Sequence, residues 1–191
     1  MKVALDIQHM YKSSQPDDKG RFAYGIHEAD IVKDYMHKTA FLMQQKGIDV
    51  IINDWDKKIL TGDYWQRHQY ANSHDAHLYI AGHLNVDSTQ ADQLIIEYNL
   101  PASYPTVIFA HILGSNLKNY MNSEKVLIKA MKADDPEYYC LDKLLMPAVL
   151  IKPLSLYNSS HMELFKDQGL FVVAEAIRNA VEEYQKTDIG I

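Results

Sequence analysis

The sequence predicts a single α/β domain: a mostly parallel, twisted sheet of about six strands with helices on both faces. Short β-branched runs alternate with longer stretches of helical period, which is the pattern of strand-helix-strand units. The 191 residues, of which 47% are apolar, are enough for one sizeable core. No repeat, low-complexity segment or long linker interrupts the chain, so residues 1–191 are interpreted as one domain.

The first part of the chain is expected to form a strand-helix-strand unit. Residues 2–7 (KVALDI) and 49–54 (DVIIND) are short β-branched runs that predict strands. Gly47 follows the helical stretch between them, at the place of a helix C-cap. The polar stretch 12–20 indicates a surface loop after the first strand. The apolar stripe of the helix consists of Ala29, Ile31, Val32, Tyr35, Met36, Leu42 and Met43.

The remaining part of the chain continues the alternation of strands and helices. Further strands are expected at residues 77–82, 93–99, 138–142 and 147–152. Helices are expected at 63–75, 105–122 and about 161–185, the last turning Val173, Ile177, Ala180, Val181 and Tyr184 inward. Parallel strands joined in this way need right-handed crossovers, and ligands of such sheets gather outside the carboxyl ends of the strands.

Composition excludes several classes of partner and site. The 25 acidic residues exceed the 19 Lys and Arg, and no basic cluster is present, so nucleic acid is not expected as a partner. Cys140 is the single cysteine, which excludes an internal disulfide and a Cys-rich zinc site. Any metal must therefore be held by His and carboxylate. No apolar run approaches the roughly 20 residues of a transmembrane helix.

Three polar residues fall at the ends of predicted elements. His9 follows the first strand, Glu28 opens the first helix and His83 follows the strand at 77–82, so all three can converge at one sheet edge. Two imidazoles and one carboxylate, completed by water, are the ligand set of a catalytic zinc site. Spacing alone leaves ordinary roles open in a chain with nine His. Glu28 could favour the helix dipole, and His83 could cap a loop.

Four blocks of the sequence form a recognisable series. They are ALDIQHM (4–10), GIHEADIV (25–32), AHLYIAGHLN (76–85) and MPAVLIKPLSLYN (146–158). Arg67, Ala71 and Asn72 precede the third block. In order and in register, these blocks and the preceding Arg and Ala-Asn pair resemble the zinc-dependent N-acetylmuramoyl-L-alanine amidases of type 3, a family of cell-wall hydrolases and catalytic domains of phage endolysins.

The resemblance implies a site, a cofactor and a reaction. It places zinc on His9, Glu28 and His83, and it implies cleavage of the amide between N-acetylmuramic acid and L-alanine in peptidoglycan. Asn85 matches the Asn after the family's ligand His, where it either fixes the loop or contacts substrate. Arg67 is interpreted as a structural ion pair. The implied partners are peptidoglycan or its muropeptide fragments.

Lys152 departs from the family pattern at a decisive position. The last strand of the family ends in a glutamate, a general base that takes a proton from the attacking water and passes it to the leaving amine. An ammonium cannot do this unless deprotonation by burial turns Lys152 into a neutral amine. We therefore expect reduced or lost hydrolysis, unless Glu97 or Glu163 supplies a substitute carboxylate. Met10, Tyr11, Pro153 and Leu154 also replace family residues.

Three functions follow as hypotheses. The first is a peptidoglycan amidase, and the second is a non-hydrolytic pseudoenzyme that keeps the fold and serves as a binding or structural module. In the second, Lys152 would hold an anion such as a stem-peptide carboxylate. The third is a zinc peptidase or deacylase. Because the chain starts directly with a strand and lacks the pattern of a secretion signal, we expect synthesis in the cytoplasm and action on the wall after delivery or lysis.

Overall fold

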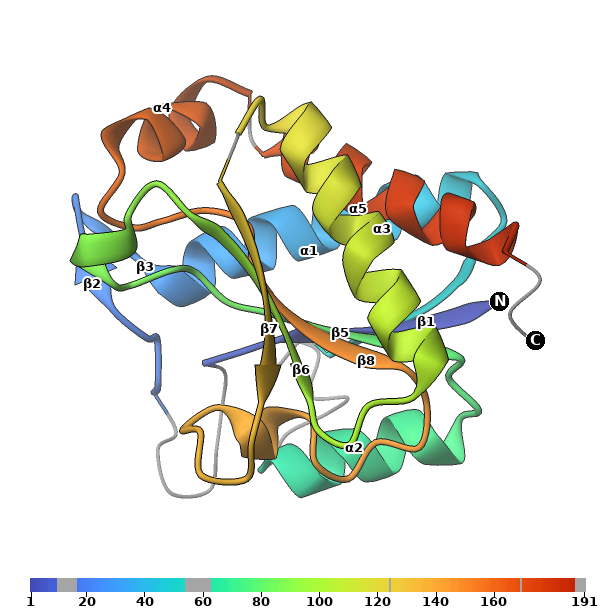
Figure 1. Cartoon of the computed structure of the whole chain (residues 1–191). Coiled ribbons are helices and arrows are strands. Elements are labelled where there is room, and N and C mark those ends of the chain that lie inside the picture. Colours follow the sequence, from blue (N-terminus) through green and yellow to red (C-terminus); the bar gives the residue numbers. More distant parts are fainter. Residues whose placement is uncertain (10–16, 54–62, 124, 169, 188–191) are drawn as a thin grey trace.

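The computed structural model describes residues 1–9, 17–53, 63–123, 125–168 and 170–187. These residues form three layers, with one sheet between two layers of helices (Figure 1). Helices α1 (Glu28–Gln45), α3 (Tyr104–Tyr120) and α5 (Phe171–Gln185) cover one face, and α2 (Tyr64–Ser73) lies on the other. The predicted α/β class with helices on both faces is confirmed.

The sheet has six strands in the order β4-β1-β5-β8-β6-β7. All neighbouring pairs are parallel except β6 with β8, so the prediction of a mostly parallel sheet is confirmed. Since β1, β5 and β8 run in one direction, their carboxyl ends meet at one edge. The strands are β4 (Asp49–Asn53), β1 (Lys2–Ile7), β5 (Leu78–Gly82), β8 (Ala148–Lys152), β6 (Leu94–Asn99) and β7 (Val126–Met131).

The main core lies between the sheet and the layer of α1, α3 and α5. The central strand β5 is buried along its whole length, as a strand covered on both faces must be. At its end, a Cβ atom on Gly82 would come within 2.5 Å of the side chains of Tyr35 and Met36. The glycine therefore lets α1 pack closely against the end of β5, next to the segment that carries His83.

A buried ion pair joins α2 to the other face of the sheet. Arg67 is 2% exposed, and its Nη1 lies 3.0 Å from Oδ1 of Asp6 on β1. The hydroxyl of Tyr79 donates to Oδ2 of the same carboxylate at 2.6 Å, and the amide of Asn53 donates to Oδ1. The expected structural role of Arg67 is confirmed, because its charge is matched and its partner carboxylate is fully bonded.

Two predictions for the second part of the chain are wrong. Residues 138–142 do not form a strand: a 3₁₀ helix spans Tyr138–Cys140, and the sixth strand is β7, which was not predicted. β7 is an edge strand whose side chains alternate between half-buried and exposed, so it lacks the continuous apolar run of a central strand. Cys140 is buried because the segment of the 3₁₀ helix packs on the face of the sheet that α2 covers, without joining the sheet as a strand.

The expected last helix at 161–185 is in fact two helices. α4 (Ser159–Gln168) is followed by α5, and Leu170 between them has a φ of 58°, which no α-helix can accommodate. The inward residues expected for α5 are all buried. A two-stranded hairpin, β2 (Phe22–Ala23) with β3 (Ile26–His27), was also not predicted and leads directly into α1. Position 54 of the expected second strand and residues Met10 and Tyr11 lie outside the described residues.

The described helices were also compared with what a bilayer requires. Among the residues that the structure describes, no helix combines the length and the apolar character needed to cross a membrane.

Candidate metal centre

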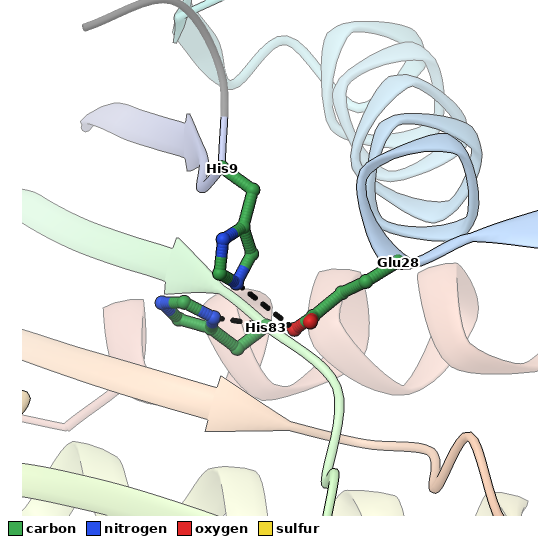
Figure 2. Close-up of side chains that lie close together, drawn as sticks. All are labelled: His9, Glu28 and His83. Carbon is green, nitrogen blue, oxygen red and sulfur yellow. Dashed lines mark hydrogen bonds and ion pairs between the residues drawn. The ribbon is translucent and has the colours of Figure 1, made fainter. Parts of the chain in front are cut away.

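His9, Glu28 and His83 come together at the carboxyl edge of the sheet (Figure 2). His9 follows β1 with a φ of 63°, a left-handed turn that ends the strand. Glu28 is the first residue of α1, and His83 follows β5 directly. The two strand ends and one helix start thus direct three potential ligands to one point, as the sequence led us to expect.

The side chains of the three residues are close enough to share one ion. Glu28 Oε1 lies 3.3 Å from Nε2 of His9 and 3.3 Å from Nδ1 of His83. One potential ligand atom from each residue lies within 4.8 Å of the other two. The backbone N–H of Leu84 donates to the same Glu28 oxygen at 2.9 Å and fixes the carboxylate in place. The arrangement is a compact cluster in which each residue offers one potential ligand atom to a shared point.

Burial and charge set the protonation states that metal ligands need. Burial alone would raise the pKa of Glu28, but hydrogen bonds and charge from His83 and His9 outweigh it and hold the pKa well below its usual range. Burial lowers the pKa of His83, although Glu28 opposes this shift. An ionised carboxylate beside a neutral imidazole is the state in which both can bind a cation.

Three features of the surroundings fit a bound zinc ion. Nε2 of His83 is buried and has no hydrogen-bond partner within the described ranges, an arrangement that proteins rarely leave unsatisfied. Nδ1 of His9 lies 3.4 Å from Oδ2 of Asp18, and a carboxylate in this position orients a ligating imidazole. Gly20 packs so closely that a Cβ there would lie 2.8 Å from Glu28 Oε2 and 2.9 Å from the His9 ring. The donor set and its close support suit zinc.

A cavity of about 350 Å³ opens above the cluster. Besides the cluster, its walls include Asp18 and Gly20 of one loop together with Tyr64, Glu137 and Tyr139. The rings of Tyr64 and Tyr139 meet edge to face with their centroids 4.8 Å apart. A larger cavity of about 520 Å³ lies at the opposite edge of the sheet, but among the described residues no comparable cluster of metal-binding side chains lines it. The smaller cavity is therefore the candidate substrate site.

Lys152 does not line this cavity. From the end of β8 its Nζ lies 2.9 Å from Glu97 Oε2 and 2.6 Å from Glu137 Oε2. Burial would lower the pKa of Lys152, but the two carboxylates outweigh it and raise the pKa above its usual value. The two carboxylates favour the charged ammonium over the neutral amine that was considered as a base.

Asn85 was expected at the site, whereas three further residues near the cluster were not. Asn85 is 2% exposed, donates to the carbonyls of Gln90 and Gln93, and accepts from the N–H of Asp87. It braces its own loop, the first of the two roles expected for it, and a contact with substrate stays a prediction. Sequence reasoning missed Asp18, Gly20 and Glu137, because loop residues carry no periodic signal that would have pointed to them.

The chain is similar to one family of enzymes along nearly its whole length. The model of the family described as N-acetylmuramoyl-L-alanine amidase matches residues 3–183. No protein with a curated description is similar enough in sequence to match.

Solved structures of such enzymes share the fold. An N-acetylmuramoyl-L-alanine amidase from Clostridium difficile 630 has 20% identity and a TM-score of 0.79, covering 98% of this chain and 97% of that one. AmiC2 of Nostoc punctiforme has 18% identity and a TM-score of 0.74, with 97% of each chain covered. The catalytic domain of CwlV from Bacillus (Paenibacillus) polymyxa var. colistinus has 18% identity and a TM-score of 0.75, covering 96% and 97%. At these identities the likeness concerns the fold.

Proposed function

The chain belongs to the N-acetylmuramoyl-L-alanine amidase family, and from this premise we propose that it is a zinc-dependent hydrolase of peptidoglycan. Its substrate is the amide between N-acetylmuramic acid and L-alanine, in the polymer or in muropeptide fragments. The observation that carries the proposal is the convergence of His9, Glu28 and His83 in a cavity. Two imidazoles and a carboxylate leave a coordination position open, which is the arrangement of catalytic zinc sites.

The residues that line the cavity have different roles in the proposed hydrolysis. His9, Glu28 and His83 hold zinc, which supplies a Lewis acid that polarises a carbonyl and makes water more acidic. Asp18 keeps the His9 ring in the orientation and tautomer that bind metal. Tyr64 and Tyr139 give the cavity an aromatic wall, against which a sugar ring or peptide can pack.

The proposal is tested by metal content and hydrolysis together. We expect about one zinc per chain and release of the L-alanine amino group from a muropeptide. Ala at both His9 and His83 should abolish each signal, because a single carboxylate cannot hold the ion. Ala at His111, an exposed histidine of α3, is the matched control and should change neither. Full zinc occupancy in the double Ala variant would refute the ligand assignment.

A second candidate is a non-hydrolytic member of the family that binds muropeptides. The observation in its favour is Lys152 at the place of the family's glutamate. The ammonium already contacts Glu97 and Glu137, however, so it is not free to hold a stem-peptide carboxylate. Stoichiometric zinc and saturable muropeptide binding without any cleavage would favour this candidate. Cleavage of other acylated amines in place of muropeptides would instead favour a zinc peptidase or deacylase.

A further inference from the structure

A carboxylate that the sequence did not reveal lines the same cavity as the candidate metal centre. Glu137 lies just before the 3₁₀ helix Tyr138–Cys140, and its side chain is 35% exposed. It lines the same cavity as His9, Glu28 and His83. Its charge also acts on His83 and opposes the burial that lowers the pKa of that ring. Glu137 is therefore both accessible from the cavity and electrostatically coupled to the cluster.

Lys152 holds this carboxylate in place. The ammonium lies between Glu137, at 2.6 Å, and Glu97 of β6, at 2.9 Å. Glu97 is 3% exposed and also lies 3.5 Å from Nζ of Lys129, so it is fixed within the sheet. The end of β8 thus carries an anchored cation, and this cation binds a carboxylate that arrives from a different segment of the chain.

We propose that Glu137 is the general base of the reaction and that Lys152 is the residue that positions it, an inference that rests on the proposed function. Glu137 takes a proton from water as the water oxygen bonds to the amide carbonyl carbon. It then gives this proton to the L-alanine nitrogen as the C–N bond breaks. The second proton of the water also ends on this nitrogen, so the products are the muramic carboxylate and the ammonium group of L-alanine, and atoms and charge balance.

The other two acidic candidates do not meet the same conditions. Glu97 contacts Lys152 within the sheet and is not one of the residues that line the cavity. Glu163 is an exposed residue of α4 and is likewise not part of the cavity wall. Of these carboxylates, Glu137 alone faces the space in which a substrate amide must lie, and the adjacent ammonium keeps it ionised, the form that accepts a proton.

The decisive variant is Glu137→Gln in the zinc-loaded full chain, because the amide keeps the shape and a hydrogen bond but cannot take a proton. We expect kcat for muropeptide hydrolysis to fall by about 10²-fold or more, with unchanged zinc content. Glu163→Gln makes the same chemical change at an exposed site and should keep the wild-type kcat.

A binding measurement tests the same role without turnover. Acetohydroxamic acid binds zinc as its anion and must give up a proton, which a neighbouring base accepts. Its affinity should fall by about 10-fold or more in Glu137→Gln and stay unchanged in Glu163→Gln. For the positioning role, Lys152→Met should lower kcat with little change in KM, and Lys152→Arg, which keeps the charge, should restore most of it.

The outcomes separate this inference from the proposed function. Wild-type kcat and wild-type hydroxamate affinity in Glu137→Gln would overturn the role of Glu137 and leave zinc-dependent hydrolysis intact. A wild-type chain that binds zinc and cleaves no muropeptide would overturn the proposed function instead. In that case the hydroxamate comparison still decides whether Glu137 accepts a proton beside the metal.

Discussion

The three candidate ligands could be predicted from the sequence, but their supports could not. His9, Glu28 and His83 stand at the ends of elements that periodicity and sequence blocks locate, so the sheet topology alone brings them together. Asp18 and Gly20 belong to a polar loop. Which loop residue turns back onto a strand end depends on tertiary contacts that leave no pattern in the sequence.

Gly20 gives the sharpest test of how tightly the cluster is supported. We expect Gly20→Ala to weaken zinc binding by about 10-fold or more, the scale of changes to groups that orient ligands. The added Cβ would lie 2.8 Å from Glu28 Oε2 and 2.9 Å from the His9 ring, so both ligands must move. Competition titration against a chromophoric zinc chelator measures the change.

Gly25 provides the control for backbone strain. Its φ of 80° is as unfavourable for alanine as the 68° of Gly20, yet a Cβ there meets nothing within 4 Å. Gly25→Ala should therefore keep the wild-type zinc affinity even if it lowers stability. Equal losses of affinity in both variants would mean that loop strain, and not contact with the ligands, explains the result.

The role of Lys152 could not be predicted from its own position in the sequence. A lysine in place of a glutamate indicates a lost base if the strand end is considered alone. The structure adds Glu137, which is 15 residues earlier in the chain and contacts the ammonium. No periodicity links the two positions, since a 3₁₀ helix and a loop separate them, so only the folded chain reveals the pair.

At the scale of elements, the sequence predicted best the segments that are buried on one or both faces. β1, β5 and β8 are largely buried strands, and their predicted bounds agree with the structure to within one residue. The edge strand β7 was missed because half of its side chains meet solvent and its pattern is weak. The division between α4 and α5 was missed because Gly169 was not taken as a helix end; in the structure Leu170, the next residue, has a left-handed backbone conformation.

Helix α5 is the element whose packing can be tested most directly. Ile177 is fully buried between α5 and the helices α1 and α3, so Ile177→Ala should leave a cavity and cost about 2–5 kcal/mol of unfolding free energy. Urea denaturation followed by circular dichroism gives this value. Gln185→Ala, at an exposed position of the same helix, should stay within about 0.5 kcal/mol of wild type. Similar small effects in both variants would show that α5 contributes little to the core.

At the scale of the whole molecule, the direction of the strands decides where chemistry can occur. β6 and β7 run opposite to the other four strands, so the end of β8 meets the beginning of β6 rather than its end. Glu97 consequently lies inside the sheet beside Lys152, and the second carboxylate on this ammonium, Glu137 at the cavity, comes from a loop. The reversal of two strands was not predictable from their composition, because parallel and antiparallel interior strands share the same apolar pattern.

The ion cluster of Glu97, Lys152 and Glu137 also predicts how stability depends on pH. Burial would raise the pKa of Glu137, but Lys152 outweighs it and lowers the pKa below the usual 4.5. The two carboxylates likewise raise the pKa of Lys152 above the usual 10.5. Because the pKa of Glu137 is lower in the folded protein, its carboxylate stabilises the fold above pH 4.5, and this stabilisation is lost as the pH falls through the pKa of the folded state. Because the pKa of Lys152 is higher in the folded protein, its ammonium stabilises the fold below pH 10.5, and this stabilisation is lost as the pH rises through the pKa of the folded state. The cluster should therefore contribute fully between these limits.

Lys152→Met isolates this contribution. At pH 7 it leaves two carboxylates without their shared cation and should cost about 2 kcal/mol or more, the lower side of the range for buried pairs because Glu137 is partly exposed. In wild type the lowered pKa of Glu137 keeps that carboxylate ionised at mildly acidic pH, and the variant lacks this effect, so the difference in unfolding free energy should shrink as the pH falls toward 4 and below. Urea denaturation of both metal-free proteins measures it, and contributions that both share, including those of the metal ligands, cancel in the comparison. A difference that stays constant from pH 7 to pH 4 would mean that Lys152 stabilises through packing of its aliphatic chain instead of through its charge.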